Sequence, residues 1–296
     1  MTTIDPIGAT ISGVQHHLDD INGVPLHHVT AGDAGTPFLL IHGWPETWYA
    51  FHRLIPLLAA RHRVVAVDLR GFGDSGTEAE VYDEESTVED LHQLVERLAI
   101  GPVHVVCQDI SGGVGFRLAA EHPGDVLSLT GIETSLAGFG LEMLADVLHG
   151  GSWHASFLGT PGIASMLAPG HERELIADWA YPLMTGPAGG ISPETIDEIV
   201  RAYSRDHGWR GTEGLYRQLF IDDGATRARA TAHPVRVPVL AVDGVNRPFT
   251  ESTLRQVAGG DFEAVTIEGV GHLVAQEDPE SLADVLLRFA GRVDPH

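Results

Sequence analysis

Residues 103–116 read VHVVCQDISGGVGF, and this stretch decides the fold. A run of β-branched residues ends near Asp109, and a glycine pair then opens a segment with helical spacing. Together they form the pattern small–x–nucleophile–x–small, with Cys107 and Ser111 as the small residues. Small neighbours are needed because a nucleophile in such a tight turn has a strained backbone. An aspartate that only capped the helix would not need them on both flanks, so we expect Asp109 to be a nucleophile.

Short β-rich runs alternate with helical patterns on both sides of this stretch. Eight runs have the character of strands: 10–18, 25–30, 38–42, 63–68, 103–109, 126–132, 237–242 and 262–267. Five segments between them have helical spacing: 48–60, 87–100, 112–121, 251–258 and 279–290. This alternation predicts an α/β fold with a mostly parallel, eight-stranded sheet and helices on both faces.

The alternation breaks once, between residues 135 and 223. This stretch contains helical pieces rich in Trp, Met, His and Tyr, separated by Gly/Pro segments, and no strand pattern. We therefore expect a helical cap at 135–223, inserted into a core formed by 1–134 and 224–296. A chain of 296 residues is long enough for one large core with such an insertion.

The composition excludes several classes of function. With 18 arginines, no lysine and 41 acidic residues, the net charge is −23, which repels phosphate backbones and anionic lipids. A nucleic-acid partner is therefore not expected. The absence of lysine excludes a Schiff base, a pyridoxal phosphate linkage and a P-loop. The single Cys107 excludes an internal disulfide and a multi-cysteine metal site, and we predict no metal and no cofactor.

No segment of the sequence is typical of a membrane protein. The longest apolar stretches are far shorter than the roughly 20 residues needed to cross a bilayer. The first residues, MTTIDPIGAT, lack the basic and apolar regions of a secretory signal. We expect a cytoplasmic protein that contacts no membrane, and a homodimer is compatible with the sequence.

Two further strand ends carry residues suited to catalysis, and ligands of doubly wound sheets bind at this edge. After the strand at 38–42, HGWPETW places His42 and Trp44 in a tight turn. Backbone N–H groups of Trp44 and Ile110 could converge there on a negative oxygen, as in an oxyanion hole. After the last strand, GVGHLVAQEDPE places His272 in a Gly-rich loop, in the chain order expected for a base that serves the nucleophile.

Together these motifs resemble the α/β-hydrolase superfamily, specifically the branch of epoxide hydrolases and haloalkane or haloacid dehalogenases. The resemblance covers nearly the whole chain and rests on HGWP, VAVDLRGFGDSG, the Asp109 turn, GIETSLAGFGLE and VGHLVAQEDPE. Many relatives have His-Asp-Trp-Gly-Gly around the nucleophile, whereas this chain has Gln108, Ile110 and Ser111. These departures do not change the predicted fold, but they weaken the prediction of the substrate.

The resemblance implies two positions for the acid that orients His272. One follows the strand at 237–242, where Asp243 lies and where relatives usually bear their acid near the position of Arg247. The other is Glu133, which lies 24 residues after Asp109, as in dehalogenases and some epoxide hydrolases. We favour Glu133, with Asp243 as the alternative.

An aspartate nucleophile has a chemical consequence that does not depend on any family. Attack of a carboxylate on an sp³ carbon gives an alkyl ester, which water can hydrolyse at its carbonyl, whereas serine would give an inert ether. Asp109 therefore indicates opening of a C–O or C–halogen bond. Hydrolysis of the ester needs His272 as the general base, with the N–H groups of Trp44 and Ile110 holding the oxyanion.

The side chains that stabilise the leaving atom distinguish an epoxide substrate from a halide substrate. Tryptophan directly after the nucleophile often binds a halide, and arginine beside it holds a haloacid, but this chain has Ile110 and no arginine before Arg117. An epoxide oxygen needs a proton donor. The resemblance assigns this task to segments like GSWHASF, with His154, and GLYRQLF, with Tyr216. Two residues are expected to line the substrate pocket: Trp153 and His42. Three further side chains are alternative donors: Tyr181, Tyr203 and His171.

The sequence therefore predicts an epoxide hydrolase that converts a small hydrophobic epoxide and water into a vicinal diol through an Asp109 ester. A haloalkane or haloacid dehalogenase with the same nucleophile is the alternative enzyme. A cap-gated binding protein without turnover is the alternative that is not an enzyme. The complete set of nucleophile, base and acid argues against the last.

Overall fold

The structure, a computed structural model, describes residues 1–218, 223–244 and 249–294. Its strands are β1 (Thr3–Ile4), β2 (Gln15–Ile21), β3 (Val24–Ala31), β4 (Phe38–Ile41), β5 (Val64–Val67), β6 (Val103–Gln108), β7 (Val126–Ile132), β8 (Val239–Asp243) and β9 (Phe262–Thr266). Over these described ranges they form one nine-stranded sheet in the order β1-β2-β3-β5-β4-β6-β7-β8-β9. Pairing is antiparallel from β1 to β5 through β2 and β3, and parallel across the rest of the sheet.

The mostly parallel α/β sheet is confirmed, with differences at its N-terminal edge. The ninth strand, β1, has only two residues and carries no alternating pattern, so no feature of the sequence predicted it. The strand expected at 10–18 starts later and runs to Ile21, where Asn22 and Gly23 turn the chain into β3. Both turn residues have positive φ, 49° and 76°. An Asn-Gly turn of this kind is typical of two-residue hairpins.

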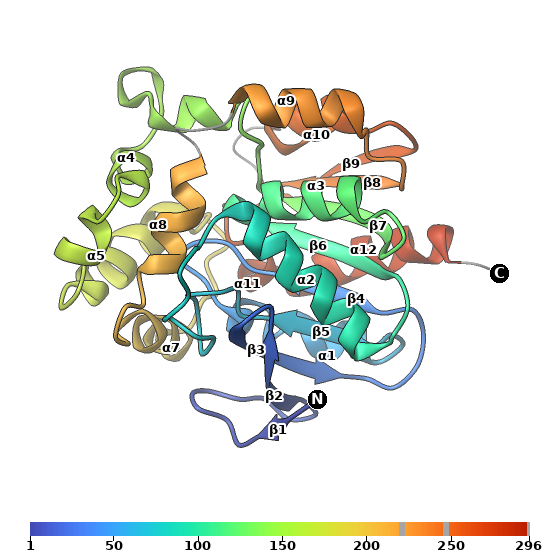
Figure 1. The fold of residues 1–296 in the computed structure, drawn as a ribbon, viewed down its shortest axis with the longest axis horizontal. Helices are drawn as coiled ribbons and strands as arrows, with labels where there is room; N and C mark the ends of the chain where they lie inside the picture. The colour runs from blue at the N-terminus through green and yellow to red at the C-terminus, as the bar shows by residue number, and fades with distance from the viewer. Residues whose placement is uncertain (219–222, 245–248, 295–296) are drawn as a thin grey trace.

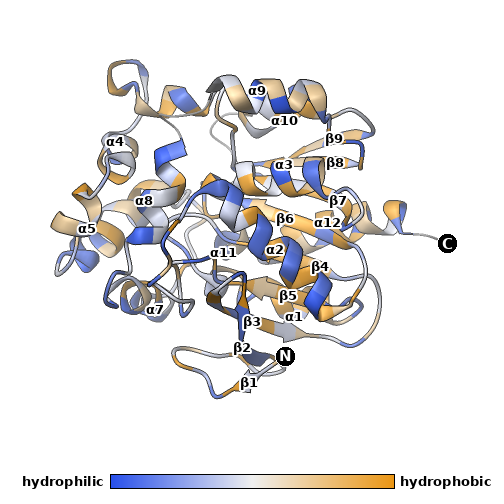
Figure 2. Cartoon of the chain, viewed as in Figure 1, coloured by the Kyte–Doolittle hydropathy of each residue, from blue (hydrophilic) through white to orange (hydrophobic). Residues whose placement is uncertain are grey.

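Helices cover both faces of the sheet (Figure 1). One face carries α2 (Glu84–Leu98), α3 (Gly112–Glu121) and α10 (Phe249–Val257), and the other carries α1 (Leu54–Ala59), α11 (Val274–Glu277) and α12 (Pro279–Val293). The central strands are buried on both sides, so Leu39 and Ile41 pack toward the first face while Leu40 packs toward the second. Figure 2 accordingly shows hydrophobic residues along the central strands and both colours along α2.

A helical cap is inserted between β7 and β8. It comprises η3 (Leu141–Ala145), η4 (Val147–His149), α4 (Trp153–Gly159), α5 (Ile163–Leu167), η5 (Arg173–Ala180), α6 (Tyr181–Met184), α7 (Pro193–Tyr203) and α8 (Arg210–Arg217). These helices lie together on the left in Figure 1. Since His154 of α4 stacks on Trp44, which follows β4, the cap covers the carboxyl ends of the parallel strands. The boundaries 135 and 223 remain a prediction.

The cap is attached to the core through the loop that follows β5. A Cβ at Gly214 of α8 would collide with the backbone of Tyr82, so only glycine allows this close approach. From α7, Arg201 Nη2 donates to both carboxylate oxygens of Asp74, at 3.1 and 3.0 Å. This close backbone approach and this ion pair are two of the contacts that hold the cap over this edge.

After the cap, α9 (Asp223–Ala232) returns to the core, where Arg229 pairs with Glu121 of α3 at 2.5 Å. Across the part of the chain that the structure describes, no helix has the length and apolar composition required to cross a membrane. The cytoplasmic location remains a prediction.

Candidate active site

Asp109 lies in the tight turn between β6 and α3. Its φ of 55° is in the left-handed region, which residues other than glycine rarely adopt. A Cβ at Gly112 would collide with the side chain of Thr134, whose hydroxyl donates to the Asp109 carbonyl at 2.5 Å. Ser111 Oγ accepts from the N–H of Gln108 at 3.0 Å and donates to its carbonyl at 2.7 Å. The small residues thus hold a strained turn that presents the Asp109 carboxylate.

The Asp109 carboxylate meets two groups from distant parts of the chain. The backbone N–H of Trp44 donates to Oδ1 at 2.9 Å, and His272 Nε2 lies 3.0 Å from Oδ2. The other ring nitrogen of His272, Nδ1, lies 3.2 Å from Oε2 of Glu133. The structure therefore brings Asp109, His272 and Glu133 into one line of contacts. Ile110 follows Asp109 directly, and the use of its N–H in an oxyanion hole remains a prediction.

His272 holds a proton firmly in this arrangement. Burial opposes a charge on the imidazole, but hydrogen bonds and charges from Asp109 and Glu133 outweigh it and raise the pKa of His272 to about 10. The ring is therefore an imidazolium between two carboxylates at neutral pH.

Glu133 and Asp243, the two candidate acids, have different surroundings. Glu133 has a positive φ of 45°, and its Oε1 accepts the N–H of Gly244 at 2.6 Å while Oε2 faces His272. Asp243 instead accepts the backbone N–H of Thr250 at 2.9 Å and that of Glu251 at 3.1 Å. These contacts make Asp243 a cap for the first turn of α10. Arg247 lies outside the described residues.

His154 and Tyr216 come from the cap and pack on the Trp44 indole. The His154 ring stacks on Trp44 with centroids 5.3 Å apart, and the Tyr216 ring lies 6.0 Å from Trp44 and 5.8 Å from His154. Burial lowers the pKa of His154 to about 4, despite the nearby charge of Asp109. Burial and the Asp109 charge raise the pKa of the Tyr216 phenol well above its ordinary value. Both side chains are thus neutral at pH 7, and the Tyr216 hydroxyl is buried with no hydrogen-bond partner among the described residues.

Comparison with known proteins identifies the family. The family model for the alpha/beta hydrolase fold matches residues 36–152. A soluble epoxide hydrolase from Corynebacterium sp. (strain C12) is 30% identical over 293 residues, which cover 93% of this chain and 97% of that protein. The chain belongs to the α/β-hydrolase family.

Two more similar proteins indicate the branch of the family to which this α/β-hydrolase belongs. A fluoroacetate dehalogenase from Burkholderia sp is 30% identical over 297 residues, which cover 94% of both chains. The crystal structure of Cfl2 from Burkholderia cenocepacia superimposes with a TM-score of 0.82 at 30% identity, covering 94% of this chain and 96% of that one. The chain is a hydrolase of the branch that contains epoxide hydrolases and dehalogenases.

Two residues of this α/β-hydrolase, His42 and His171, lie elsewhere than the sequence suggested. His42, expected in the substrate pocket, is fully buried below the turn, where Nδ1 donates to the Gly43 carbonyl at 2.8 Å and Nε2 accepts the Leu69 N–H at 3.2 Å. It therefore supports the turn that carries Trp44. His171, an alternative proton donor, has a side chain that is 65% exposed, so it is not at the site.

The other candidates of the cap have distinct environments. Tyr181 is buried beside Gln276, with its hydroxyl 3.4 Å from Oε1. Tyr203 packs against Trp209 with ring centroids 5.0 Å apart. Trp153 precedes His154 on α4 but is 43% exposed, and its ring lies 4.7 Å from that of Trp179.

Sequence reasoning missed a buried polar group next to His272. Glu46, the fifth residue of HGWPETW, accepts from Gln276 Nε2 at 2.7 Å and from the Gly43 N–H at 3.3 Å. Complete burial raises the pKa of Glu46 to about 7, although the Gln276 hydrogen bond opposes this. Gln108 Nε2 donates to the His272 carbonyl at 3.2 Å. Glu46 belongs to the HGWPETW motif, but no pattern in the sequence indicates its partners.

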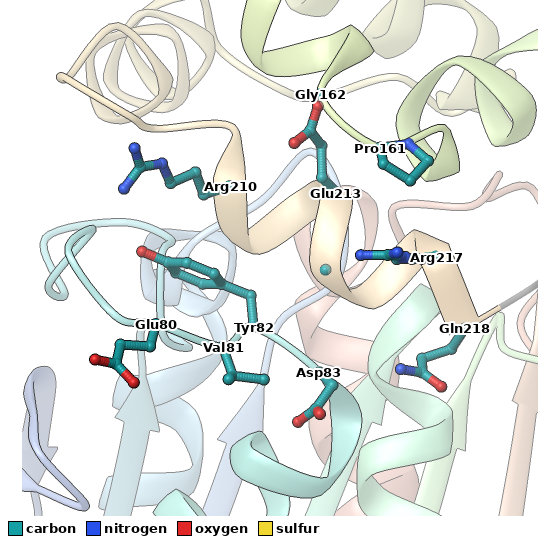
Figure 3. Close-up of a pocket in the computed structure, with 11 residues that line it drawn as sticks. Glu80, Val81, Tyr82, Asp83, Pro161, Gly162, Arg210, Glu213, Arg217 and Gln218 are labelled. Carbon is teal, nitrogen blue, oxygen red and sulfur yellow. The ribbon is translucent and has the colours of Figure 1, made fainter. Parts of the chain in front are cut away.

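A cleft of about 540 Å³ lies between α8 and the loop before α2 (Figure 3). Its walls include Tyr82 and Asp83 of the core and Arg210, Glu213 and Arg217 of α8. Asp109, His272 and Glu133 do not line it. This cleft is therefore separate from the proposed chemistry.

Two groups of described residues bring together side chains that could ligate a metal. One consists of His92, His122 and Asp125, and the other of His27, Asp68 and Asp74. Neither group includes Asp109, His272 or Glu133.

Proposed function

We propose that this hydrolase is an epoxide hydrolase that converts a small hydrophobic epoxide and water into a vicinal diol through an alkyl ester on Asp109. One observation carries the proposal. The Asp109 carboxylate is held between the Trp44 N–H and His272, and the neutral donors His154 and Tyr216 pack on the same tryptophan. A carboxylate nucleophile and a nearby proton donor are what an epoxide requires.

In the first half-reaction, Asp109 Oδ2 attacks a ring carbon and the C–O bond breaks. Its electron pair goes to the epoxide oxygen, which takes a proton from Tyr216 and becomes a hydroxyl group. The raised pKa of Tyr216 keeps the phenol protonated until this moment. His154, neutral and buried, is the second donor to the same oxygen.

Formation of the ester also changes His272. The neutral ester removes one of the two negative charges that stabilise the imidazolium, so its pKa falls. The proton of His272 can then pass to the Tyr216 phenolate. This transfer leaves a neutral imidazole oriented by Glu133. The base is thus produced only after the nucleophile has been alkylated.

In the second half-reaction, His272 takes a proton from water and the resulting hydroxide attacks Cγ of the Asp109 ester. The N–H groups of Trp44 and Ile110 are proposed to stabilise the oxyanion. Collapse of this intermediate releases the diol and restores the carboxylate opposite an imidazolium. Protons balance over the cycle, because one proton of the water stays on His272 and the other passes from the new carboxyl group of Asp109 to the leaving alkoxide, which becomes the second hydroxyl of the diol.

A dehalogenase is the second candidate, since the fluoroacetate dehalogenase is a relative. A haloacid needs a cation beside the nucleophile, but Arg117 Nε of α3 donates to Glu121 Oε1 at 3.0 Å. The position directly after Asp109 is Ile110, which donates nothing from its side chain. These residues favour the epoxide over the halide.

The test traps the intermediate in the His272→Gln variant. We expect ester formation without hydrolysis, so intact-mass spectrometry after addition of an epoxide should show a stable adduct that peptide mapping places on Asp109. The parent enzyme, as the control, should accumulate little adduct. An adduct on Ser111 or Cys107 would overturn the mechanism. No adduct in the variant and no diol from the parent would favour a binding protein without turnover.

Oxygen labelling separates the ester route from direct attack by water. In a single turnover of the parent enzyme in ¹⁸O water, the label should enter the Asp109 carboxylate. The diol should acquire ¹⁸O only in later turnovers. Label in the diol of the first turnover would exclude the ester.

A further inference from the structure

Residues 269–273, which we call the base loop, are held by their backbone on both sides of His272. The His272 N–H donates to the Met184 carbonyl at 2.8 Å. The N–H groups of the two flanking residues, Gly271 and Leu273, donate to the carboxylate of Glu277 at 3.0 and 3.2 Å. Three successive N–H groups are thus bound to groups outside the loop, and these groups fix the position of the base.

Glu277 also joins the base loop to the cap. It lies in α11, directly after the loop, and its Oε2 accepts the N–H of Gly186 at 2.7 Å and that of Gly271 at 3.1 Å. Gly186 follows α6 of the cap. A carboxylate that only capped α11 would bind the N–H groups of its own loop, as in a capping box, and would not need the cap residue.

The base loop and residues 184–186 lie too close together for side chains between them. A Cβ at Gly186 would lie 2.2 Å from the backbone nitrogen of Gly271, and a Cβ at Gly271 would lie 2.3 Å from the Met184 carbonyl oxygen. Neither glycine is among those with positive φ. The direct contact of the two backbones, and not a left-handed conformation, therefore requires glycine at both positions.

The burial of Glu277 indicates that its hydrogen bonds matter. The residue is 7% exposed, and burial raises its pKa, although the backbone N–H groups and the charge of His272 oppose this. A buried carboxylate costs free energy unless hydrogen bonds compensate for its lost hydration. Here these bonds can form only while the base loop and the cap segment stay together, so the ionised side chain favours that arrangement.

We infer, on the basis of the proposed function, that Glu277 is a positioning residue for hydrolysis of the ester. By holding the base loop against residues 184–186, it keeps Nε2 of His272 within reach of the water that attacks the Asp109 ester. Alkylation depends on it less, because the nucleophile is held by its own turn and by the Trp44 N–H. Residues 184–186 therefore act together with the core, although they belong to the cap.

Glu277→Gln is the first test, with styrene oxide as the probe. The amide keeps one acceptor oxygen but turns an NH₂ group toward a backbone N–H, so part of the contact is lost. Quenched-flow mixing with intact-mass spectrometry measures the formation and the decay of the adduct on Asp109. We expect hydrolysis to slow by about 10- to 100-fold, since a displacement of about 1 Å can have this effect, and alkylation to change by less than about 3-fold.

Glu213→Gln is the matched control. The Glu213 carboxylate joins α8 to α5 within the cap, because it accepts the N–H and the hydroxyl of Ser165 at 2.8 and 2.9 Å. It does not contact the base loop, so hydrolysis should proceed at the parent rate. Equal slowing of both steps in Glu277→Gln, or hydrolysis as fast as in Glu213→Gln, would overturn the inference.

Gly186→Ala tests the same contact with the charge of Glu277 in place. The added methyl group forces the two segments apart, so the His272 ring should move away from its two carboxylates and its pKa should fall, as measured by NMR of ¹⁵N-labelled histidine. Gly124→Ala is the control, because a methyl group there meets no described atom within 4 Å. An unchanged pKa in Gly186→Ala overturns the inference even where Glu277→Gln does not fold.

The outcomes distinguish this inference from the proposed function. If styrene oxide gives no adduct in the His272→Gln chain and no diol with the parent enzyme, the proposed function fails, and the role of Glu277 in hydrolysis fails with it. If the ester forms and both Glu277→Gln and Gly186→Ala hydrolyse it at the parent rate, epoxide hydrolysis stands and only the role of Glu277 is wrong.

Discussion

The three candidate catalytic side chains of the core half and the Tyr216 phenol of the cap half differ in how far their polar groups are satisfied. In the core, Asp109, His272 and Glu133 contact one another, and Trp44 and Gly244 supply backbone N–H groups. In the cap, the Tyr216 hydroxyl is buried without a partner among the described residues. The core half is therefore organised before substrate arrives, whereas the cap half is completed by the substrate.

The difference follows from how each half is built. The core residues follow adjacent strands β6 and β7 and the loop after β9, so hydrogen-bonded strands fix their spacing. The cap residues lie on short helices that meet the core at a few contacts, such as the Arg201–Asp74 ion pair. We expect changes in the core half to stop turnover, and changes in the cap half to slow only the opening of the epoxide.

The largest effect is expected from Glu133→Gln. This change leaves the shape of the side chain but removes a charge that raises the pKa of His272 and that we propose orients its ring. Loss of such an orienting carboxylate can lower turnover by about 10⁴-fold. Steady-state kcat for diol formation measures the effect.

Asp243→Asn is the matched control for this prediction. Its hydrogen bonds go to the start of α10, and asparagine caps helices nearly as well as aspartate. Turnover should therefore stay within a few-fold of the parent value. If Asp243→Asn lowers kcat more than Glu133→Gln does, the acid follows β8 and the assignment of Glu133 is wrong.

Tyr216→Phe tests the cap half. General acid catalysis contributes about 10² to 10⁴ in rate, so alkylation of Asp109 by an epoxide should slow by a factor in this range. Hydrolysis of a preformed ester should change little. Pre-steady-state measurement of the two steps separates them, and His171→Ala, at the cap surface, is the control.

The same variant distinguishes epoxides from halides, because a halide leaves without a proton. The parent enzyme could release halide from a haloalkane or fluoroacetate faster than it opens any epoxide. That result would make the dehalogenase the favoured function and the epoxide hydrolase the alternative. If Tyr216→Phe and His154→Ala both open epoxides at the parent rate, the donor is one of the remaining candidates, Tyr181 or Tyr203.

Asp109→Asn tests whether the charge of the nucleophile raises the pKa of the base, His272. The pKa of His272 is about 10 while both carboxylates are present. Removing one nearby charge typically shifts a pKa by about 1 to 3. We expect the pKa of His272 to fall in this variant, as measured by NMR of ¹⁵N-labelled histidine. An unchanged pKa would mean that alkylation of Asp109 does not release the base.

Much of the core half could be predicted because it depends on local pattern and chain order. The tight turn at Asp109 needs small residues next to it. Parallel strands bring the residues that follow them to one edge of the sheet. The exceptions at the edge of the sheet have physical reasons. β1 is too short to show an alternating pattern. The turn at Asn22–Gly23 sets the end of β2 at Ile21, beyond the predicted end at residue 18.

The cap half could be predicted only in part, because its contacts join helices far apart in the sequence. His154 and Tyr216 were identified through a resemblance, and their packing on Trp44 depends on how α4 and α8 fold over the core.

The smallest effect is expected from Arg201→Gln, which tests how firmly the cap must be held. Arg201 is 33% exposed and Asp74 is 4% exposed, so solvent screens the pair in part. Such a pair contributes no more than about 1 kcal/mol, and we expect the stability of the protein to fall by at most that amount. Alkylation of Asp109 should slow by about 2- to 5-fold, the rate equivalent of this energy.

The control for Arg201→Gln is Arg173→Gln. Arg173 pairs with Asp197 inside the cap at 2.5 Å, and both side chains are more than half exposed, so its loss should change neither step. Hydrolysis of the ester should be unaffected by either variant, because neither arginine contacts His272 or Glu133. The His272 backbone does contact the cap, but its N–H donates to the Met184 carbonyl of α6 at 2.8 Å, which involves neither arginine. If Arg201→Gln slows hydrolysis as much as alkylation, the cap also shapes the core half, and the two halves are not independent.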